Sequence, residues 1–216
     1  MIAVKRFTCN MLAENCYVVS DDTHEAVIID CGALYQEENE AICSYIKTEG
    51  LTPKHLLCTH AHFDHCIGNG FIYKEFGLKP EVHREDQFLM EKMKAQTREI
   101  LGIELPIDVP PVGAYFTEKD CIAFGSHQLQ ILHTPGHTPG GVVFYCQEES
   151  IAFSGDTLFR MSIGRTDFER GSYEALIHAL KDVLAQLPGD TKIFPGHGPA
   201  TTMAEEIKYN PYFMSF

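Results

Sequence analysis

Hydrophobic residues along the chain fall into short runs that are separated by turn-forming residues. In the first half, these runs predict strands at residues 2–7, 16–20, 26–30 and 55–58. Apolar residues at helical spacing predict a helix over residues 37–48, which Gly50 ends, and a second helix over residues 68–76. Residues 85–101 are more polar, and we expect them to form a helix that is exposed to solvent.

The second half repeats this pattern in kind. It predicts strands at residues 129–133, 141–146, 151–154 and 192–194. Ser172 is placed to cap a helix whose apolar positions share one face: Leu176, Ile177, Leu180, Val183, Leu184 and Leu187. Residues 105–113 contain several prolines and are the expected seam between the halves. Strands followed by a helix in each half predict an α/β fold with two sheets face to face and helices outside.

Length and composition narrow the class of protein. The chain can bury one substantial core, and we expect residues 1–216 to form a single domain. We expect a cytoplasmic protein with no membrane partner, because no apolar run approaches the roughly 20 residues of a membrane helix and no signal peptide is visible. The eight cysteines include no Cys-x-x-Cys pair and are expected to be reduced thiols. The formal net charge of −13 argues against nucleic acid and leaves a small-molecule substrate.

A run of metal-binding side chains follows the predicted strand at residues 55–58. It reads His-Ala-His-Phe-Asp-His and supplies His60, His62, Asp64 and His65. Residues two apart in an extended loop point the same way, so His60 and His62 can bind one ion. Asp64 and His65 then lie on the far side of the turn, where they can serve a second ion. Imidazole and carboxylate ligands suit zinc, iron or manganese better than calcium or magnesium.

Three more candidate ligands follow later strands. His137 lies in a Thr-Pro-Gly-His-Thr-Pro-Gly turn, Asp156 in Ser-Gly-Asp, and His197 in Pro-Gly-His-Gly. In each case a glycine lets the chain turn tightly after an apolar strand and brings the next side chain over the end of the sheet. Sites in layered α/β proteins form where strand ends gather at one edge. We therefore expect these side chains to meet the first loop and complete a metal centre.

These motifs, in this order, resemble the metallo-β-lactamase fold superfamily over nearly the whole chain. The resemblance implies a four-layer αββα sandwich of two mixed β-sheets flanked by helices. It also implies two groups of metal ligands bridged by Asp156: His60, His62 and His137 in one, and Asp64, His65 and His197 in the other. The expected cofactors are two divalent metal ions, with zinc first among the candidates and iron or manganese as alternatives.

Within that superfamily, residues 155–159 and 164–168 resemble the glyoxalase-II-like (hydroxyacylglutathione hydrolase-like) enzymes. This implies hydrolysis of a thioester such as S-lactoylglutathione, with a hydroxide that bridges the two ions as the nucleophile. Asp64 is the candidate catalytic residue, because it can orient this hydroxide as well as bind metal. Arg165 has two interpretations. It binds a substrate carboxylate, or it forms an ion pair with a nearby acid of its own loop, Asp167 or Glu169.

Other activities on the same fold stay open at this point. Residues 164–168 also resemble the persulfide dioxygenases, which use a single iron and differ around the residue that matches His197. A lactone hydrolase is a further alternative. A β-lactamase is disfavoured, because it is expected to carry cysteine where Asp156 stands.

Overall fold

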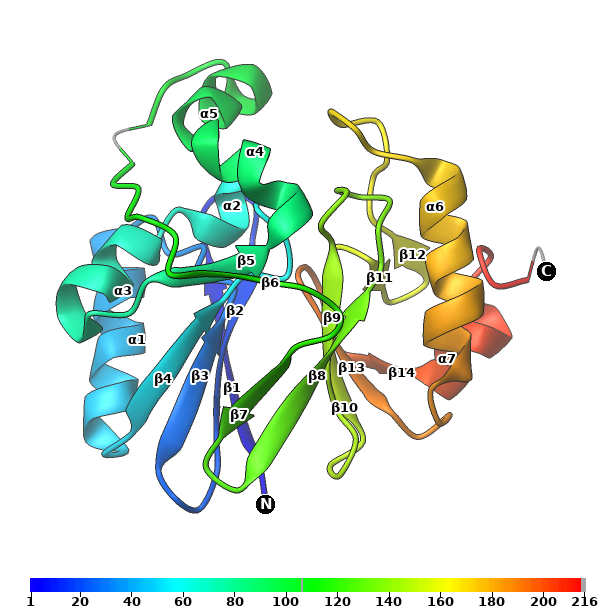
Figure 1. Cartoon of the computed structure of the whole chain (residues 1–216), viewed down its shortest axis with the longest axis horizontal. Coiled ribbons are helices and arrows are strands. Elements are labelled where there is room, and N and C mark those ends of the chain that lie inside the picture. Colours follow the sequence, from blue (N-terminus) through cyan, green and yellow to red (C-terminus); the bar gives the residue numbers. More distant parts are fainter. Residues whose placement is uncertain (106, 215–216) are drawn as a thin grey trace.

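The computed structural model describes residues 1–105 and 107–214 (Figure 1). In this part of the chain the first sheet contains β1 (Ala3–Cys9), β2 (Glu14–Ser20), β3 (Glu25–Ile29), β4 (Thr52–Leu57), β5 (Pro80–His83) and β6 (Ala114–Phe116). The second contains β7 (Cys121–Phe124), β8 (His127–His133), β9 (Val142–Cys146), β10 (Ile151–Gly155), β13 (Lys192–Pro195) and β14 (Thr201–Thr202). A separate hairpin pairs β11 (Leu158–Phe159) with β12 (Ser162–Ile163).

The helices lie between and outside these strands. They are α1 (Gln36–Thr48), α2 (Phe63–Cys66), α3 (Asn69–Phe76), α4 (Gln87–Glu91), α5 (Met93–Leu101), α6 (Tyr173–His178) and α7 (Met203–Tyr209). Short 3₁₀ turns occur at Arg84–Asp86 and Leu184–Gln186, and a π-helical turn at Ala179–Val183. None of the helices in the described residues is long and apolar enough to cross a membrane.

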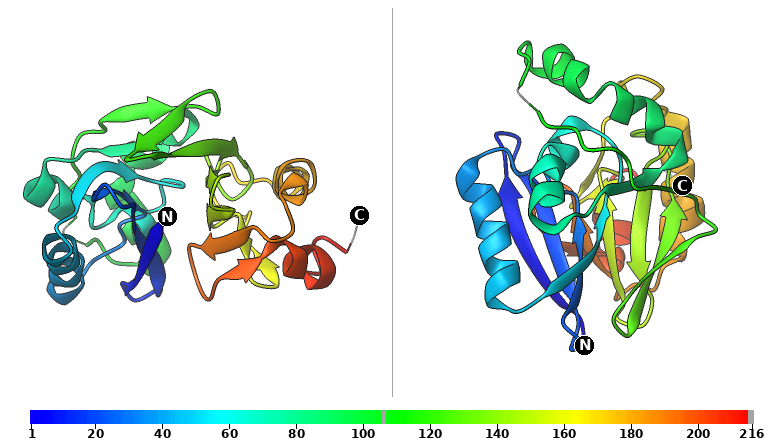
Figure 2. Two further views of the ribbon diagram at one scale, coloured as in Figure 1. Left: turned by 90° about the horizontal axis from the view of Figure 1, so that it is seen from below. Right: turned by 60° about the vertical axis from the view of Figure 1, so that its left-hand side comes forward.

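The two sheets pack face to face, as the two views of Figure 2 show. Strand order is β1-β2-β3-β4-β5-β6 in the first sheet and β14-β13-β10-β9-β8-β7 in the second. Both sheets are mixed. In the first sheet, strands β3 to β6 pair in parallel, whereas β1 with β2 and β2 with β3 pair antiparallel. In the second sheet, β10 is parallel to β13 and antiparallel to β9. Helices α1 and α3 cover one outer face, and α6 and α7 cover the other (Figure 1). The four-layer αββα arrangement is therefore confirmed.

Strand β2 contributes side chains to two hydrophobic clusters, one on each face of the first sheet. Its side chains alternate between the faces of the sheet, because successive residues of a strand point to opposite sides. Tyr17 and Val19 face the second sheet and join the central core between the sheets. Cys16 and Val18 face the other way and pack in the cluster that lies under α1 and α3. Both faces are buried, so the strand is apolar throughout its middle.

The helix predicted after residue 172 begins where expected. The Ser172 hydroxyl accepts a hydrogen bond from the Ala175 amide, which is the capping contact that the sequence predicted. The apolar stripe continues as Leu176, Leu180 and Leu184, which are all fully buried. Leu180 and Leu184 pack in one cluster with residues of the second sheet such as Val143. The helix is α-helical only to His178 and then passes through the π and 3₁₀ turns, which keep the stripe facing inward.

Two expectations about the middle of the chain are wrong. Residues 85–101 do not form one exposed helix, because the segment breaks into a 3₁₀ turn, α4 and α5, and buries Leu89, Met90 and Met93. These side chains pack against the loop after β4, including Phe63, so that the segment covers the site instead of standing in solvent. The polar residues on its surface conceal this packing in the sequence.

The seam between the halves also lies later than predicted. Strand β6 belongs to the first sheet and β7 to the second, so the chain crosses between sheets at residues 117–120 and not at residues 105–113. Of that proline-rich stretch, Pro106 lies outside the described residues. Strands β5, β6 and β7 were not predicted, because they are short and lack a clear alternating pattern.

Candidate metal centre

Four of the predicted ligands come from the loop after β4. His60 lies in a bend of this loop, and His62, whose backbone is extended, is the residue directly before α2. Asp64 and His65 lie on the single turn of α2, so they project to a different side from the first two histidines. All four side chains are buried. The division of this loop into two pairs of ligands therefore has a structural cause, which is the change from extended to helical backbone at His62.

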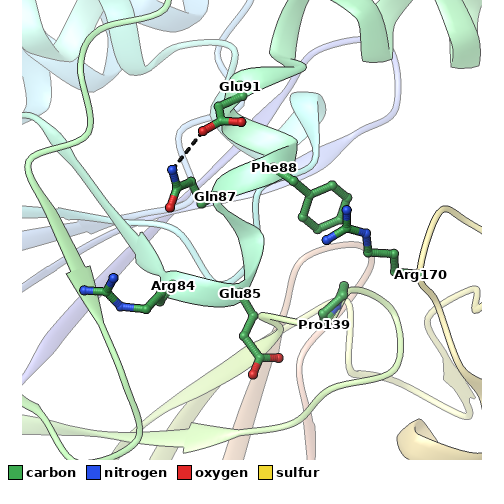
Figure 3. A pocket seen from close by; sticks show the side chains of 7 residues that line it. All are labelled: Arg84, Glu85, Gln87, Phe88, Glu91, Pro139 and Arg170. Atoms are coloured by element: carbon green, nitrogen blue, oxygen red, sulfur yellow. Dashed lines mark hydrogen bonds between the residues drawn. The ribbon is translucent and has the colours of Figure 1, made fainter.

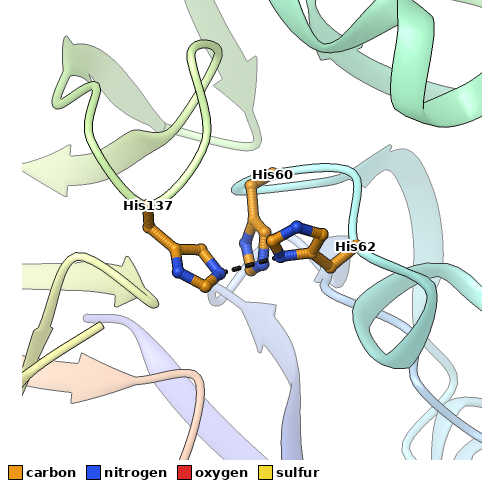
Figure 4. A group of neighbouring side chains, drawn as sticks. All are labelled: His60, His62 and His137. Atoms are coloured by element: carbon orange, nitrogen blue, oxygen red, sulfur yellow. Dashed lines mark hydrogen bonds between the residues drawn. The ribbon is translucent and has the colours of Figure 1, made fainter. Parts of the chain in front are cut away.

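The three distant residues reach the same place. The Nε2 atom of His137 lies 2.8 Å from Nδ1 of His62 (Figure 4) and 3.5 Å from Oδ2 of Asp156. The other carboxylate oxygen of Asp156, Oδ1, lies 3.3 Å from Nε2 of His65 and 3.7 Å from Nε2 of His197. One carboxylate thus faces both groups of histidines, and the structure brings all of the predicted ligands together.

Ligand atoms form two compact groups that match the expected sets. His60, His62 and His137 form one group, whose rings stand at 80° to 88° to one another. Asp64, His65 and His197 form the other. In each group the ligand atoms lie within 4.8 Å of one another, which allows them to surround a single ion. A further group, Asp30 with His60 and His65, lies behind them.

Two of the turns that carry predicted ligands require a glycine directly before the ligand. Gly155, before Asp156, has a φ of +47°, and a Cβ there would overlap the Thr59 side chain. A Cβ on Gly196, before His197, would overlap the carboxylate of Asp156 and approach the His65 ring to 2.6 Å. The glycines that the sequence placed beside the ligands therefore make room for the other ligands as well as for the turns.

Hydrogen bonds on the far side of the rings set which nitrogen faces the centre. His65 donates from Nδ1 to Asp30, at 3.0 Å, and His137 donates from Nδ1 to the Arg165 carbonyl, at 2.7 Å. His197 donates from Nδ1 to the Leu12 carbonyl, at 3.1 Å. Since a neutral imidazole carries one N–H, these contacts leave each Nε2 lone pair directed into the centre.

Thr59 fixes which nitrogen of His60 faces the centre. Its hydroxyl donates to Asp30 at 2.7 Å and therefore accepts from Nδ1 of His60, at 3.1 Å. Asp30 also accepts from the Thr59 amide, at 2.7 Å. Asp30 thus supports two ligands from opposite groups. Asp30 was not among the predicted site residues, although it is a polar residue at the end of a predicted strand, directly before Cys31-Gly32. Unlike the distant ligands, it does not follow a glycine.

Several buried polar atoms in this centre have no hydrogen-bond partner among the described residues. They are His60 Nε2, His65 Nε2 and Asp156 Oδ1. Leaving a buried polar atom unpaired costs roughly 1–3 kcal/mol each, so native proteins rarely do so without a reason. Here the unpaired atoms are lone pairs of imidazole and carboxylate that face one another. Bound divalent ions would satisfy them, and this donor set suits zinc, iron or manganese.

The electrostatics of the two groups differ. Burial, reinforced by the neighbouring histidines, lowers the pKa of His60 well below its usual value, and burial together with His137 lowers the pKa of His62 to about 3. Burial also acts to lower the pKa of His65, but the carboxylates of Asp156, Asp64 and Asp30 outweigh it and raise that pKa well above its usual value. The second group is therefore the one that attracts positive charge most strongly.

A cavity of about 370 Å³ opens directly onto the centre. Five of the predicted ligands line it: His62, Asp64, His137, Asp156 and His197. The rest of the lining is mainly apolar and consists of Leu12, Phe63, Ile100, Phe159, Ser162, Ile163, Arg165 and Phe168. Arg165 is 66% exposed and donates two hydrogen bonds to Asp167, at 2.9 and 2.8 Å. Its guanidinium also lies over the Phe168 ring, 4.5 Å from the centroid. The ion pair within the loop is thus present, with the side chain at the rim of the cavity.

Two other features do not belong to the centre. A hollow of about 390 Å³ lies outside it (Figure 3) and is lined by Arg84, Glu85, Gln87, Phe88, Glu91, Pro139 and Arg170. His83, Glu118 and His133 also lie close enough to suggest a metal group. Their imidazole rings stack at 21°, however, so the in-plane lone pairs do not converge, and His83 accepts from the Glu85 amide at Nδ1. We interpret this group as packing.

The comparisons with known proteins agree with the geometry. The profile of the Metallo-beta-lactamase superfamily matches residues 10–197. The chain is 35% identical over 209 residues to the hydroxyacylglutathione hydrolase GloC of Haemophilus influenzae, covering 94% of this chain and 93% of that protein. It is also similar to the crystal structure of TTHA1623 in a di-iron-bound form, with a TM-score of 0.85, 37% identity, and 97% and 100% of the two chains covered.

A third similarity is to the crystal structure of the BLEG-1 B3 metallo-beta-lactamase, with a TM-score of 0.89, 33% identity and 99% of each chain covered. The chain belongs to the metallo-beta-lactamase superfamily. With its clusters of histidine and aspartate ligands, it is a metal-dependent hydrolase of that superfamily, and its centre has the composition of a binuclear site.

Proposed function

We propose that this protein hydrolyses a small-molecule thioester in the cytoplasm, at a centre that holds two divalent metal ions. His60, His62 and His137 would hold one ion, and Asp64, His65 and His197 would hold the other, since these are the groups that their ligand atoms form. Asp156 faces both groups and could be shared between the two ions. The observation that carries the proposal is the set of unpaired buried lone pairs that face the same space. Zinc is the first candidate metal, with iron or manganese as alternatives.

When bound, two such ions lower the pKa of a water molecule from 15.7 towards about 7 and polarise a carbonyl oxygen. The residues of the chain supply what surrounds this chemistry. The low pKa of His60 and His62 keeps both imidazoles neutral and able to donate lone pairs. Asp64 is buried and lines the cavity, with Oδ2 3.4 Å from Nε2 of His197, where it could accept a hydrogen bond from a water molecule and orient it.

No cysteine lines this cavity, so the residues described there offer no thiolate nucleophile. The apolar rim excludes water and accommodates an uncharged acyl group. Arg165, which shares the rim, is proposed to contact a substrate carboxylate in exchange for its partner Asp167. The name of the Haemophilus influenzae relative supports a hydroxyacylglutathione as the thioester, and S-lactoylglutathione is therefore the substrate to test first.

The test combines metal analysis with a hydrolysis assay. We expect two equivalents of zinc, iron or manganese per chain in the purified protein, and release of free thiol from S-lactoylglutathione. Replacement His62→Ala should reduce kcat/KM by at least about a hundredfold while circular dichroism shows the fold intact, because the first metal site loses a ligand. The matched control is His178→Ala, which removes an exposed histidine that also lies near two carboxylates, far from the cavity lining.

Four outcomes would contradict the proposal. Protein without bound metal, or metal-loaded protein without hydrolysis, would reject it directly. One iron per chain, with oxygen consumed in the presence of glutathione persulfide, would instead identify a persulfide dioxygenase. Faster turnover of a lactone or of a β-lactam than of the thioester would change the substrate class, and the likeness to the BLEG-1 B3 metallo-beta-lactamase makes a β-lactam the necessary comparison.

A further inference from the structure

One carboxylate outside the centre connects the two loops that supply its histidines. Asp86 is the last residue of the 3₁₀ turn at Arg84–Asp86, directly before helix α4, and is fully buried. Its Oδ2 accepts from the Ala61 amide at 3.0 Å and from the Thr138 hydroxyl at 2.8 Å. Its Oδ1 accepts from the Gly140 amide at 2.7 Å. Figure 3 labels Glu85 and Gln87, the neighbours of Asp86 in sequence, beside the turn that carries Pro139.

Two of the three donors are immediate neighbours of proposed metal ligands. Ala61 lies between His60 and His62, and Thr138 follows His137. Asp86 therefore joins, through a single side chain, the two segments whose imidazoles form the first group of ligands. These segments come from different sheets, since one follows β4 and the other follows β8.

The contact leaves little room for adjustment. A Cβ on Gly140 would lie 2.7 Å from the Asp86 carboxylate, so the turn after His137 packs directly on it. On the other side, Gln96 from α5 donates to the Ala61 carbonyl at 3.0 Å and accepts from the Phe63 amide at 3.1 Å. The first loop is thus fixed through its backbone on both sides of His62, by a segment that contributes no ligand.

We propose that Asp86 is a positioning residue that sets the distance between the His60–His62 loop and the His137 turn, and so controls metal affinity at the three-histidine site. This inference rests on the proposed function, because it assumes that the three histidines bind an ion. None of these three hydrogen bonds reaches a ligand side chain, so Asp86 acts through residues that lie next to the ligands in the chain.

The test compares two buried aspartates. Asp86→Asn keeps the shape of the side chain but turns an NH₂ group towards the Ala61 amide or the Gly140 amide, so that at least one loop loses its acceptor. Asp21→Asn is the matched control, because Asp21 also accepts backbone and hydroxyl hydrogen bonds, from Thr23 and Ser126, but lies at the opposite end of the strands. Both substitutions remove a buried negative charge.

Zinc dissociation constants for both sites are measured by competition with a chromogenic chelator, well below the unfolding temperature of each variant. The Co²⁺ d–d spectrum and kcat and KM are recorded on the loaded proteins. For Asp86→Asn we expect affinity at one site to fall at least tenfold, a changed Co²⁺ spectrum, and a lower kcat with little change in KM. Asp21→Asn should match the wild type in affinity and spectrum even though it unfolds at a lower temperature.

Equal affinities and spectra for Asp86→Asn and wild type would overturn the inference. So would an equal loss of affinity in Asp21→Asn, since this would trace the effect to general destabilisation. If Asp86→Asn does not fold, Thr138→Val is the deciding variant, because it removes one of the three hydrogen bonds to Asp86. A twofold to tenfold loss of zinc affinity at one site would support the inference, and unchanged affinity would reject it. Wild-type protein that binds no metal would count against the proposed function instead.

Discussion

The two ends of the paired sheets both bury carboxylates, but they satisfy them differently. At the end away from the metal centre, Asp21 follows β2 and accepts hydrogen bonds from the amides and hydroxyls of Thr23 and Ser126. It also lies 3.0 Å from Nδ1 of His127, whose other nitrogen lies 3.0 Å from Glu149. This cluster joins the turn after β2 to the turn after β7, one from each sheet, and its polar atoms have partners.

At the other end the same fold leaves lone pairs unpaired. His60 Nε2, His65 Nε2 and Asp156 Oδ1 are buried and have no hydrogen-bond partner among the described residues. Both ends bring polar side chains of the two sheets together, so proximity alone does not distinguish a site from a structural contact. The difference is in hydrogen bonding: a completed network holds the fold together, and an incomplete network of lone pairs indicates where a cation binds.

Among the substitutions that test this difference between the two ends, we expect Asp30→Asn to have the largest effect, which is on metal affinity. Asp30 holds His65 and Thr59 from behind, and an amide there would turn an N–H towards a donor. We expect metal affinity to fall about 10- to 100-fold, as for other residues that orient metal-bound histidines. Chelator competition measures this loss. Asp22→Asn, at an exposed position of the opposite end, is the control and should have no effect.

Unchanged metal affinity in Asp30→Asn would break the comparison between the ends. It would mean that the hydrogen bonds behind the ligands are structural in the same sense as those of Asp21, and that the ligand rings hold their orientation without them.

A smaller effect, on stability and not on activity, is expected from Asp21→Asn. Burial acts to raise the pKa of Asp21, but hydrogen bonds from Thr23, Ser126 and His127 outweigh it and lower the pKa below its usual value of 3.8. The ionised form is therefore favoured by folding. Its contribution is fully present above about pH 4 and is lost as the pH falls through the lower pKa of the folded state.

At pH 7 we expect Asp21→Asn to lower the free energy of unfolding by about 2 kcal/mol. The difference between variant and wild type should shrink below pH 4, because Asp21 becomes protonated in the unfolded chain at a higher pH than in the folded protein. Urea unfolding at pH 7 and at pH 3 measures both values, and kcat/KM should stay within twofold of wild type. An identical difference at the two pH values would show that the charge of Asp21 is not what stabilises this end.

The smallest effect is expected from Arg165→Ala. Its guanidinium is paired with Asp167 in the free protein, so contact with a substrate carboxylate exchanges one partner for another and gains only about 1 kcal/mol. KM should therefore rise roughly fivefold with kcat unchanged. Arg98→Ala, which removes an exposed arginine paired with Glu104, is the control. A KM equal to that of wild type would leave Arg165 with the ion pair of its loop as its role.

The site could be predicted because its signals are local. Each ligand follows an apolar run, and the distant ones also follow a glycine, so His137, Asp156 and His197 were recognisable one at a time. Their grouping around two ions was available only through the resemblance to a known superfamily. The segment at residues 85–101 shows the opposite case: its polar surface suggested an exposed helix, although Asp86 and Gln96 are buried and hold the first ligand loop.

The amino-acid sequence by itself determined the α/β class, most of the strands and the set of candidate ligands, because hydrophobic period and residue chemistry are properties of neighbouring positions. Only the tertiary structure decided which nitrogen of each histidine faces the centre. That choice depends on acceptors such as the backbone carbonyls of Leu12 and Arg165, and every residue type carries a carbonyl. A hydrogen bond to a backbone carbonyl cannot be predicted from residue types. It depends on the position of the backbone in the fold and not on the side chain at that position.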